Sequence, residues 1–346
     1  MQSFIQVKMK RLRLPATCLL AFLIFATTLK AQTIVQLQTG KPTSIRGLSV
    51  VDDSVAWISG SRGHIAITHD GGKSWDWTQV KGFEKADFRD IEVFSAKSAV
   101  IMSSGTPALV LKTTDGGVTW QEKYRNTDTA YFLDAMDFDS PKHGLILGDP
   151  IKNKFLLLET NDGGETWAPF KNQPDALAGE ASFAASGTCL RIINGDILIA
   201  TGGTNARLLS YSIKNKKWDY ASFPITHGKA SQGSFSVAVG KNDAILIGGN
   251  YSKDKVTDSV AVNFIPHPFK ILNTANKQPA GFQSSVEFIN GDTFLSTGTP
   301  GTNITTDGGV TWRQVDATSY NVCRKAKHGK MVLLAGDKGK IGVLKM

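Results

Sequence analysis

The sequence predicts an all-β fold in which seven four-stranded sheets close into a ring. Three observations lead to this prediction: an octapeptide that occurs four times, a nearly regular spacing of tryptophans, and short apolar runs that end in Gly. Apolar runs bounded by turn residues are typical of strands buried on both faces. No convincing amphipathic helix follows residue 31, so we expect strands alone to build the core.

The octapeptide has the pattern Thr-x-Asp-Gly-Gly-x-(Ser/Thr)-Trp. Its four copies span residues 68–75, 113–120, 160–167 and 305–312, and a degenerate copy ends at Trp218. The motif resembles the Asp-box, or BNR, repeat of β-propellers. The tryptophans that end these copies lie roughly 45 to 50 residues apart, with one gap of about twice that length, as expected of blade repeats. Phe264 lies near the place where the unit without a Trp would end.

The two ends of the chain predict a seventh blade. Residues 319–346 contain three strand-like runs and residues 33–40 contain a fourth. We therefore expect a seven-bladed β-propeller closed by an N-terminal outer strand in the last blade, which leaves no open sheet edge. This gives a single domain over 32–346, with blades ending near residues 80, 123, 170, 220, 266 and 315.

The first 31 residues predict a secretory signal peptide. Basic residues precede a short apolar run, and the small residue Ala31 ends the segment. Translation would start at Met1 or Met9, and an uncleaved anchor is the alternative. No lipoprotein-type triplet precedes Cys18, so we expect no lipid anchor. The predicted product is exported, periplasmic or extracellular, without stable membrane insertion after cleavage.

The positive charge falls once the signal peptide is removed. The whole chain has 39 Lys and Arg against 30 Asp and Glu, but five of the bases and none of the acids lie within the first 31 residues. Without a run of like charges, the sequence does not predict nucleic-acid binding. We expect no cofactor and no metal, because His64 and His227 lack partners at ligand spacing. Cys189 and Cys323 remain, and a single bridge between them stays open.

The boxes are predicted to be structural. Asp accepts main-chain hydrogen bonds in a turn, Gly adopts positive φ, and Trp packs between blades. Although their repetition suggests catalysis, we expect these residues to build hairpins: Asp70, Trp75, Asp115, Trp120, Asp162, Trp167, Asp307 and Trp312. A calcium site is not expected, because each box offers one carboxylate where Ca²⁺ prefers several oxygens.

The face opposite the boxes is the predicted binding face. Propeller strands alternate in direction, so the loops between second and third strands and the loops between blades lie on that face. Loops on a rigid ring commonly form binding sites. The candidate binding residues are Arg46, Arg89, Asp90, Asp134, Asp149, Glu180, Arg207, His227, Tyr251 and Ser284.

Glu180 and Arg207 allow two interpretations. Arg207 could serve as a bidentate donor in a pocket for an anion. Alternatively, the two residues form an ion pair within one blade.

The order of motifs resembles a bacterial family of exported propellers similar to photosystem II stability/assembly factors. The resemblance spans roughly residues 44 to 346 and rests on segments 45–48, 88–90, 148–150, 179–188, 202–203, 206–207, 233–236 and 248–249. In photosynthetic members it implies a chaperone-like scaffold that binds a membrane-protein subunit. We therefore expect a monomeric binding or assembly scaffold for a protein, peptide or glycan.

The alternative is a sialidase-like glycoside hydrolase or lyase that uses the same face. Such enzymes also carry Asp-boxes, and Glu180 and Tyr320 would be the catalytic candidates here. Segments 44–47 and 88–90 depart from the sialidase arginine motif, and seven units rather than six also count against an enzyme. Fold alone does not decide, because propellers carry many functions.

Overall fold

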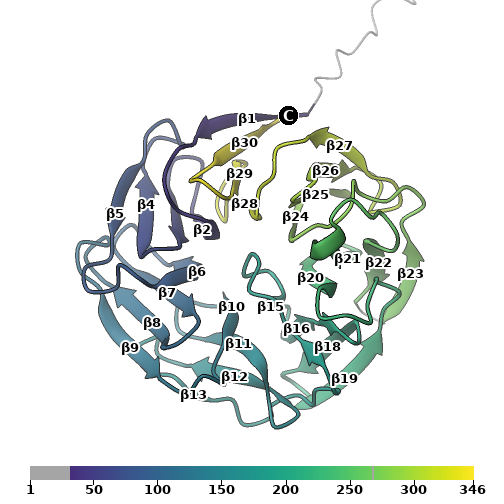
Figure 1. Ribbon diagram of the computed structural model, residues 1–346, viewed down its shortest axis with the longest axis horizontal. Helices are drawn as coiled ribbons and strands as arrows, with labels where there is room; N and C mark the ends of the chain where they lie inside the picture. Colours follow the sequence, from purple (N-terminus) through teal and green to yellow (C-terminus); the bar gives the residue numbers. More distant parts are fainter. Residues whose placement is uncertain (1–31, 267–268) are drawn as a thin grey trace, which may run out of the picture. The chain divides into compact units, whose positions relative to one another are not determined.

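The computed structural model describes residues 32–266 and 269–346. The predicted signal peptide, residues 1–31, lies outside the described residues. The unit from Thr33 to Lys345 confirms the predicted all-β, seven-bladed propeller (Figure 1). Among the described residues, no helix is long and apolar enough to cross a membrane.

Each blade is an antiparallel sheet whose first strand lies innermost (Figure 1). Blade 1 contains β2 (Ile45–Val50), β3 (Ala56–Gly60), β4 (His64–Thr68) and β5 (Asp76–Gln79). Blade 2 contains β6 (Asp87–Val93), β7 (Ala99–Ser104), β8 (Ala108–Thr113) and β9 (Gln121–Asn126). Blade 3 contains β10 (Leu133–Phe138), β11 (Gly144–Ile151), β12 (Lys154–Thr160) and β13 (Ala168–Pro169). Blade 4 contains β15 (Leu190–Ile193), β16 (Asp196–Ala200), β18 (Arg207–Ser212) and β19 (Lys217–Ser222).

The remaining blades complete the ring. Blade 5 contains β20 (Gln232–Val239), β21 (Ala244–Asn250), β22 (Ala261–Ile265) and β23 (Lys270–Thr274), with the 3-10 turn η1 (Tyr251–Lys253) after β21. Blade 6 contains β24 (Ser285–Asn290), β25 (Thr293–Gly298), β26 (Gly301–Thr305) and β27 (Arg313–Asp316). Blade 7 contains β28 (Val322–Lys325), β29 (Val332–Ala335) and β30 (Ile341–Lys345), and β1 (Thr33–Gln38) pairs with β30 as its outer strand. Two short strands, β14 (Glu180–Ala181) and β17 (Gly202–Gly203), extend the blade 5 sheet at its inner edge.

Blade 5 differs from the sequence-based expectation in its outer half. Phe264, which the spacing placed at the end of the unit, lies within the third strand β22 and is fully buried. The outer strand follows at Lys270–Thr274. This blade has no box, so no motif in the sequence marks its last hairpin.

The boxes form the hairpins between the third and fourth strands. In the first box, Asp70 accepts hydrogen bonds from the main-chain N–H of Ser74 (2.9 Å), the Ser74 hydroxyl (2.6 Å) and the Thr68 hydroxyl (2.9 Å). These bonds, led by that of the Ser74 hydroxyl, lower the pKa of Asp70 to about 2. Gly71 and Gly72 adopt φ of 74° and 84°, which favour glycine.

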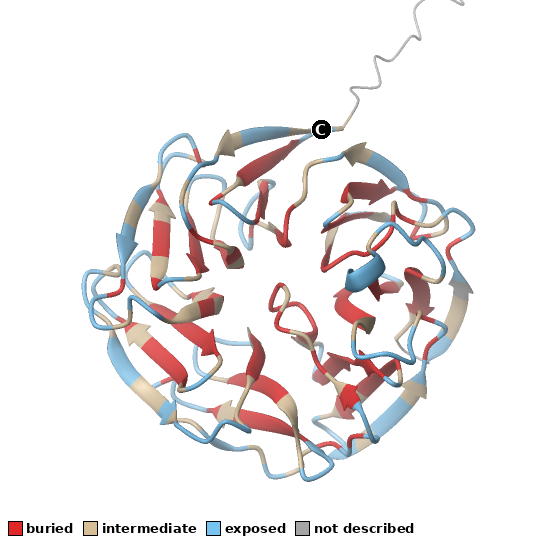
Figure 2. Ribbon diagram, viewed as in Figure 1, coloured by how far each residue is buried: buried red, intermediate tan, exposed pale blue. Residues whose placement is uncertain are grey.

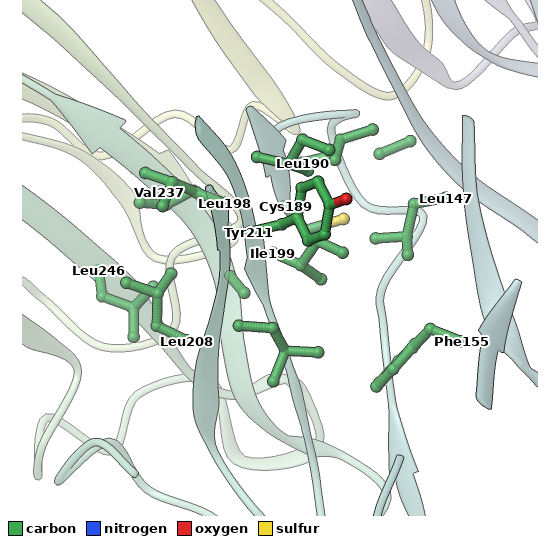
Figure 3. Close-up of a cluster of buried hydrophobic side chains, with 14 of the residues drawn as sticks. Leu147, Phe155, Cys189, Leu190, Leu198, Ile199, Leu208, Tyr211, Val237 and Leu246 are labelled. Carbon is green, nitrogen blue, oxygen red and sulfur yellow. The ribbon is translucent and has the colours of Figure 1, made fainter. Parts of the chain in front are cut away.

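The hydrophobic core lies between neighbouring blades. Inner strands are largely buried and outermost strands are largely exposed (Figure 2). The largest cluster joins blades 3, 4 and 5 and contains Phe155, Cys189 and Val237 (Figure 3). Cys189 and Cys323 are both buried and free, so they form no bridge with each other.

Candidate functional site

A loop from blade 4 lies in the central channel. We call residues 182–189, which precede β15, the channel loop; Figure 1 shows it inside the ring beside the β15 label. On one side of the loop, the Ser182 hydroxyl donates to Asp134 of blade 3 at 2.6 Å. Arg89 of blade 2 donates to the Ala184 carbonyl at 3.3 Å, and Arg46 of blade 1 donates to the Ala185 carbonyl at 3.4 Å.

The second half of the channel loop contacts the remaining blades. The Ser186 hydroxyl donates to the Ser284 carbonyl of blade 6 at 2.7 Å, and the Thr188 hydroxyl donates to Ser236 of blade 5 at 2.6 Å. Arg324 of blade 7 donates to the Gly187 carbonyl at 3.4 Å. The loop therefore bonds to all six other blades and separates the channel mouth on the box face from the mouth on the opposite face.

Three candidate residues occupy the same irregular position in neighbouring inner strands. Arg46, Arg89 and Asp134 each lie where the register of the inner strand shifts, in β2, β6 and β10 respectively. Such bulges redirect a side chain and occur often beside functional sites. All three lie toward the face opposite the boxes, as the alternation of strand direction predicts.

Arg46 and Arg89 form the basic part of this face. Burial lowers the pKa of Arg46, and the nearby positive charge of Arg89 lowers it further. Arg89 also pairs with Asp87 at 2.8 Å. Two guanidinium groups held this close attract a carboxylate more strongly than either does alone.

An acidic pair lies next to the arginines. Burial, and then the negative charge of Asp149, raise the pKa of Asp134, while burial also raises the pKa of Asp149. The channel loop provides Ser182 as a hydrogen-bond donor to Asp134. The two carboxyls therefore anchor the base of the loop rather than forming an open acidic surface.

Aromatic side chains continue this face from the channel loop to blade 5. Phe183 stacks on Phe235 with ring centroids 3.8 Å apart, and Phe282 meets Phe235 edge-on at 4.7 Å. Tyr251, on η1, contacts the same group and is 50% exposed. The face therefore presents both cationic groups and an exposed aromatic ring.

Glu180 and Arg207 form the ion pair of the second interpretation. Arg207 donates through Nε to Oε1 (2.9 Å) and through a terminal nitrogen to Oε2 (2.5 Å) of Glu180. The Thr201 hydroxyl and the main-chain N–H of Leu177 donate to the same carboxylate. Since the Glu180 side chain has no exposed area, the structure agrees with the ion pair within one blade and not with an open anion pocket at Arg207.

Two other candidates are buried rather than presented on the face. Asp90 is 1% exposed and accepts hydrogen bonds from the main chain of Ile91 and Met136. Ser284 is 5% exposed and donates to the Asn321 carbonyl. Their burial corrects their expected role as surface binding residues.

The two catalytic candidates do not come together in an open site. Tyr320 is 1% exposed, and burial raises its pKa to about 12, which disfavours the phenolate. The Glu180 carboxylate is held in an ion pair with Arg207. His227 is exposed, with Nδ1 2.7 Å from the Ile225 carbonyl. Within residues 32–266 and 269–346, no group of three or more His, Cys, Asp or Glu residues could hold a metal ion.

Sequence reasoning missed the charged residues that line the channel on the box face. Glu92, Asp137, Arg191 and Glu287 lie on four inner strands, opposite the second or third residue of the following strand. The signal was present in the sequence, since each is a charged residue with an apolar residue on either side. It becomes recognisable only once the strands are aligned by blade.

Buried carboxyls predict an unusual pH dependence of stability. Burial raises the pKa of Asp90 to about 7, so between about pH 4 and 7 the folded protein binds a proton that the unfolded chain releases. The free energy of unfolding should therefore fall as pH rises through this range, by up to about 1.4 kcal/mol per pH unit for this group. Urea unfolding at several pH values measures the slope.

The variant Asp90→Asn is the control for this prediction, because it removes the titrating group and keeps an acceptor oxygen for Ile91. Its slope should be smaller than that of the wild type. A wild-type stability that rises from pH 4 to 7 would contradict the prediction.

Comparisons with known proteins agree with this architecture. A family model described as "Photosynthesis system II assembly factor YCF48" matches residues 26–127. The curated "Photosystem II assembly lipoprotein Ycf48" of Synechococcus sp. (strain CC9902) is 29% identical over 124 residues, which cover 35% of this chain and 34% of the relative. The match thus spans about a third of the length of that relative.

Solved structures match over nearly the whole chain. "YCF48 bound to D1 peptide" has a TM-score of 0.65 at 14% identity and covers 91% of this chain and 95% of its own. "YCF48 from Cyanidioschyzon merolae" has a TM-score of 0.62 at 14% identity, covering 90% and 98%. BamB from Moraxella catarrhalis has a TM-score of 0.55 at 12% identity, covering 91% and 89%. At these identities the structures show the fold, a seven-bladed β-propeller, and over residues 26–127 the chain is similar to the photosystem II assembly factor YCF48 family.

Proposed function

We propose that this chain is an exported binding scaffold that holds an extended protein or peptide segment on the face opposite the Asp-boxes. The observation that carries the proposal is the pair Arg46 and Arg89, which two neighbouring bulges direct to the same mouth of the channel. Tyr251 adds an exposed aromatic ring to this face. Arginine and tyrosine are enriched among the residues that dominate protein interfaces.

The relatives support the choice of a protein ligand. One solved YCF48 structure is described as bound to a D1 peptide, and the curated relative is named an assembly lipoprotein. We propose the same class of ligand here, together with export directed by residues 1–31. No feature of the described residues favours the glycosidase alternative, because its two candidate residues are buried.

Site-specific photo-crosslinking tests which face binds. A photoreactive phenylalanine analogue replaces Tyr251, which is 50% exposed on the proposed face, or Val118, which is 81% exposed in a box hairpin. We expect the Tyr251 variant to capture a defined protein from an envelope extract of the source cells at least fivefold more efficiently. Adding Arg46→Gln and Arg89→Gln should reduce this capture.

Both crosslinking positions are exposed, so the Val118 variant controls for general surface reactivity. Equal capture of the same protein from the two positions would overturn the assignment to this face. Circular dichroism and thermal unfolding of the arginine variant establish that it remains folded, since both arginines also contact the channel loop.

A further inference from the structure

The channel mouth on the box face forms a second, separate pocket. It has a volume of about 390 Å³ and is lined by inner-strand residues from all seven blades. The channel loop lies at its inner end, where Arg324 donates to the Gly187 carbonyl. The lining residues lie at the ends of the inner strands nearer the box face, away from Arg46 and Arg89.

A residue at the same level of every inner strand lines this pocket. The residues are Ser49, Glu92, Asp137, Arg191, Ala238, Glu287 and Arg324, each paired with the second or third residue of the next strand. Five of these seven are charged, and Lys327 adds a further positive charge at the rim. Apolar residues such as Val50, Phe138 and Phe288 complete the lining. A pocket with an apolar lining and a few converging polar groups is typical of small-molecule sites.

The positive side of the pocket consists of two arginines that share one carboxylate. Arg191 leans across blade 5, where Ala238 leaves room, and its Nε donates to the Val237 carbonyl at 3.3 Å. Its guanidinium lies 3.5 Å from Glu287, and that of Arg324 lies 4.0 Å from the same carboxylate. A guanidinium carries five N–H donors, so these few long contacts leave donors for a ligand carboxylate.

The negative side lies on blades 2 and 3. Asp137 accepts a hydrogen bond from the main-chain N–H of Ile192 at 2.6 Å and lies 4.0 Å from Arg191. Glu92 pairs with Lys327. Burial raises the pKa of both carboxyls, even though neighbouring cationic groups stabilise their charged forms. An ammonium group placed between them would add to that stabilisation.

The positive and negative charges of the side chains that line the pocket cancel, and this balance indicates the class of ligand. Three carboxylates face three cationic side chains, so a ligand with a net charge would leave one group unbalanced in a poorly solvated site. A molecule with one carboxylate and one ammonium group keeps the balance and uses both sides. We propose that this pocket binds a small zwitterion of the free α-amino-acid class, with its carboxylate at Arg191 and Arg324 and its ammonium group at Asp137 and Glu92.

Isothermal titration calorimetry of the wild-type protein with each of the twenty common α-amino acids at pH 7 tests the proposal. We expect at least one amino acid to bind. Its N-acetyl derivative and its methyl ester, which each lack one charge, should bind at least tenfold more weakly. Because this comparison uses only the wild type, it does not depend on the stability of any variant.

Arg191→Gln and Arg125→Gln form a matched pair of variants, because Arg125 lies on the outer strand β9 with a side chain that is 44% exposed. Arg191→Gln should weaken amino-acid binding at least tenfold, whereas Arg125→Gln should leave it unchanged. The proposal is overturned if no amino acid binds, if the derivatives bind as tightly as the parent, or if Arg125→Gln has the larger effect. The crosslinking experiment on the opposite face is unaffected by any of these results.

Discussion

Replacing Arg207 by Met is expected to lower the free energy of unfolding by about 3–5 kcal/mol, because it leaves a buried carboxylate without its partner. The Glu180 side chain has no exposed area, and Arg207 makes two hydrogen bonds to it. The variant also loses the hydrogen bond from Arg207 to the Asp175 carbonyl and its contact with the Tyr220 ring. Urea unfolding at pH 7 measures the change.

Two comparisons isolate the contribution of the unpaired charge. Lys154→Met breaks an ion pair with Asp175 whose side chains are 52% and 71% exposed, so it should cost less than about 1 kcal/mol. Glu180→Gln combined with Arg207→Met should recover part of the loss, because the remaining amide is neutral. If Arg207→Met costs no more than Lys154→Met, Glu180 is solvated in solution and the pair is not structural.

The sequence was sufficient to predict the blades because their hairpins are local structures. Each box encodes its own turn: in the first, Thr68, Asp70 and Ser74 bond within seven residues of chain, so the motif marks a hairpin wherever it occurs. The number of blades then follows from the spacing of the boxes. Where the box is missing, as before Lys270, the position of the outer strand was not predictable.

The binding face was less predictable because its contacts join distant parts of the chain. The spacing of Glu180 and Arg207 fits both an open anion site and a closed pair, and only burial distinguishes them. The small residues of segment 179–188 also suggested a pocket. They instead allow the channel loop to pass between the inner strands, which depends on positions fixed by six other blades.

Gly187→Ala is expected to destabilise the protein by about 2–5 kcal/mol. An added Cβ would lie 2.1 Å from Oδ2 of Asp90, a buried side chain that is itself held by two main-chain N–H groups. Gly187 also has φ of 67°, a conformation that costs other residues about 1–2 kcal/mol. Overpacking of a buried site adds about 1–3 kcal/mol to this cost. Urea unfolding measures the sum.

Gly195→Ala separates the two contributions within the same blade. Gly195 has φ of 84°, but no atom lies within 4 Å of its added Cβ, so only the backbone cost of about 1–2 kcal/mol applies. The difference between the variants therefore measures how firmly the channel loop is held against Asp90. If the two variants are equally stable, the loop can move away from Asp90 at little cost, and the channel is gated by this loop rather than closed by it. Such a gate would join the pocket on the box face to the arginines on the other, so hydrogen exchange at Ala185 and Gly187 should then be fast in the wild type as well.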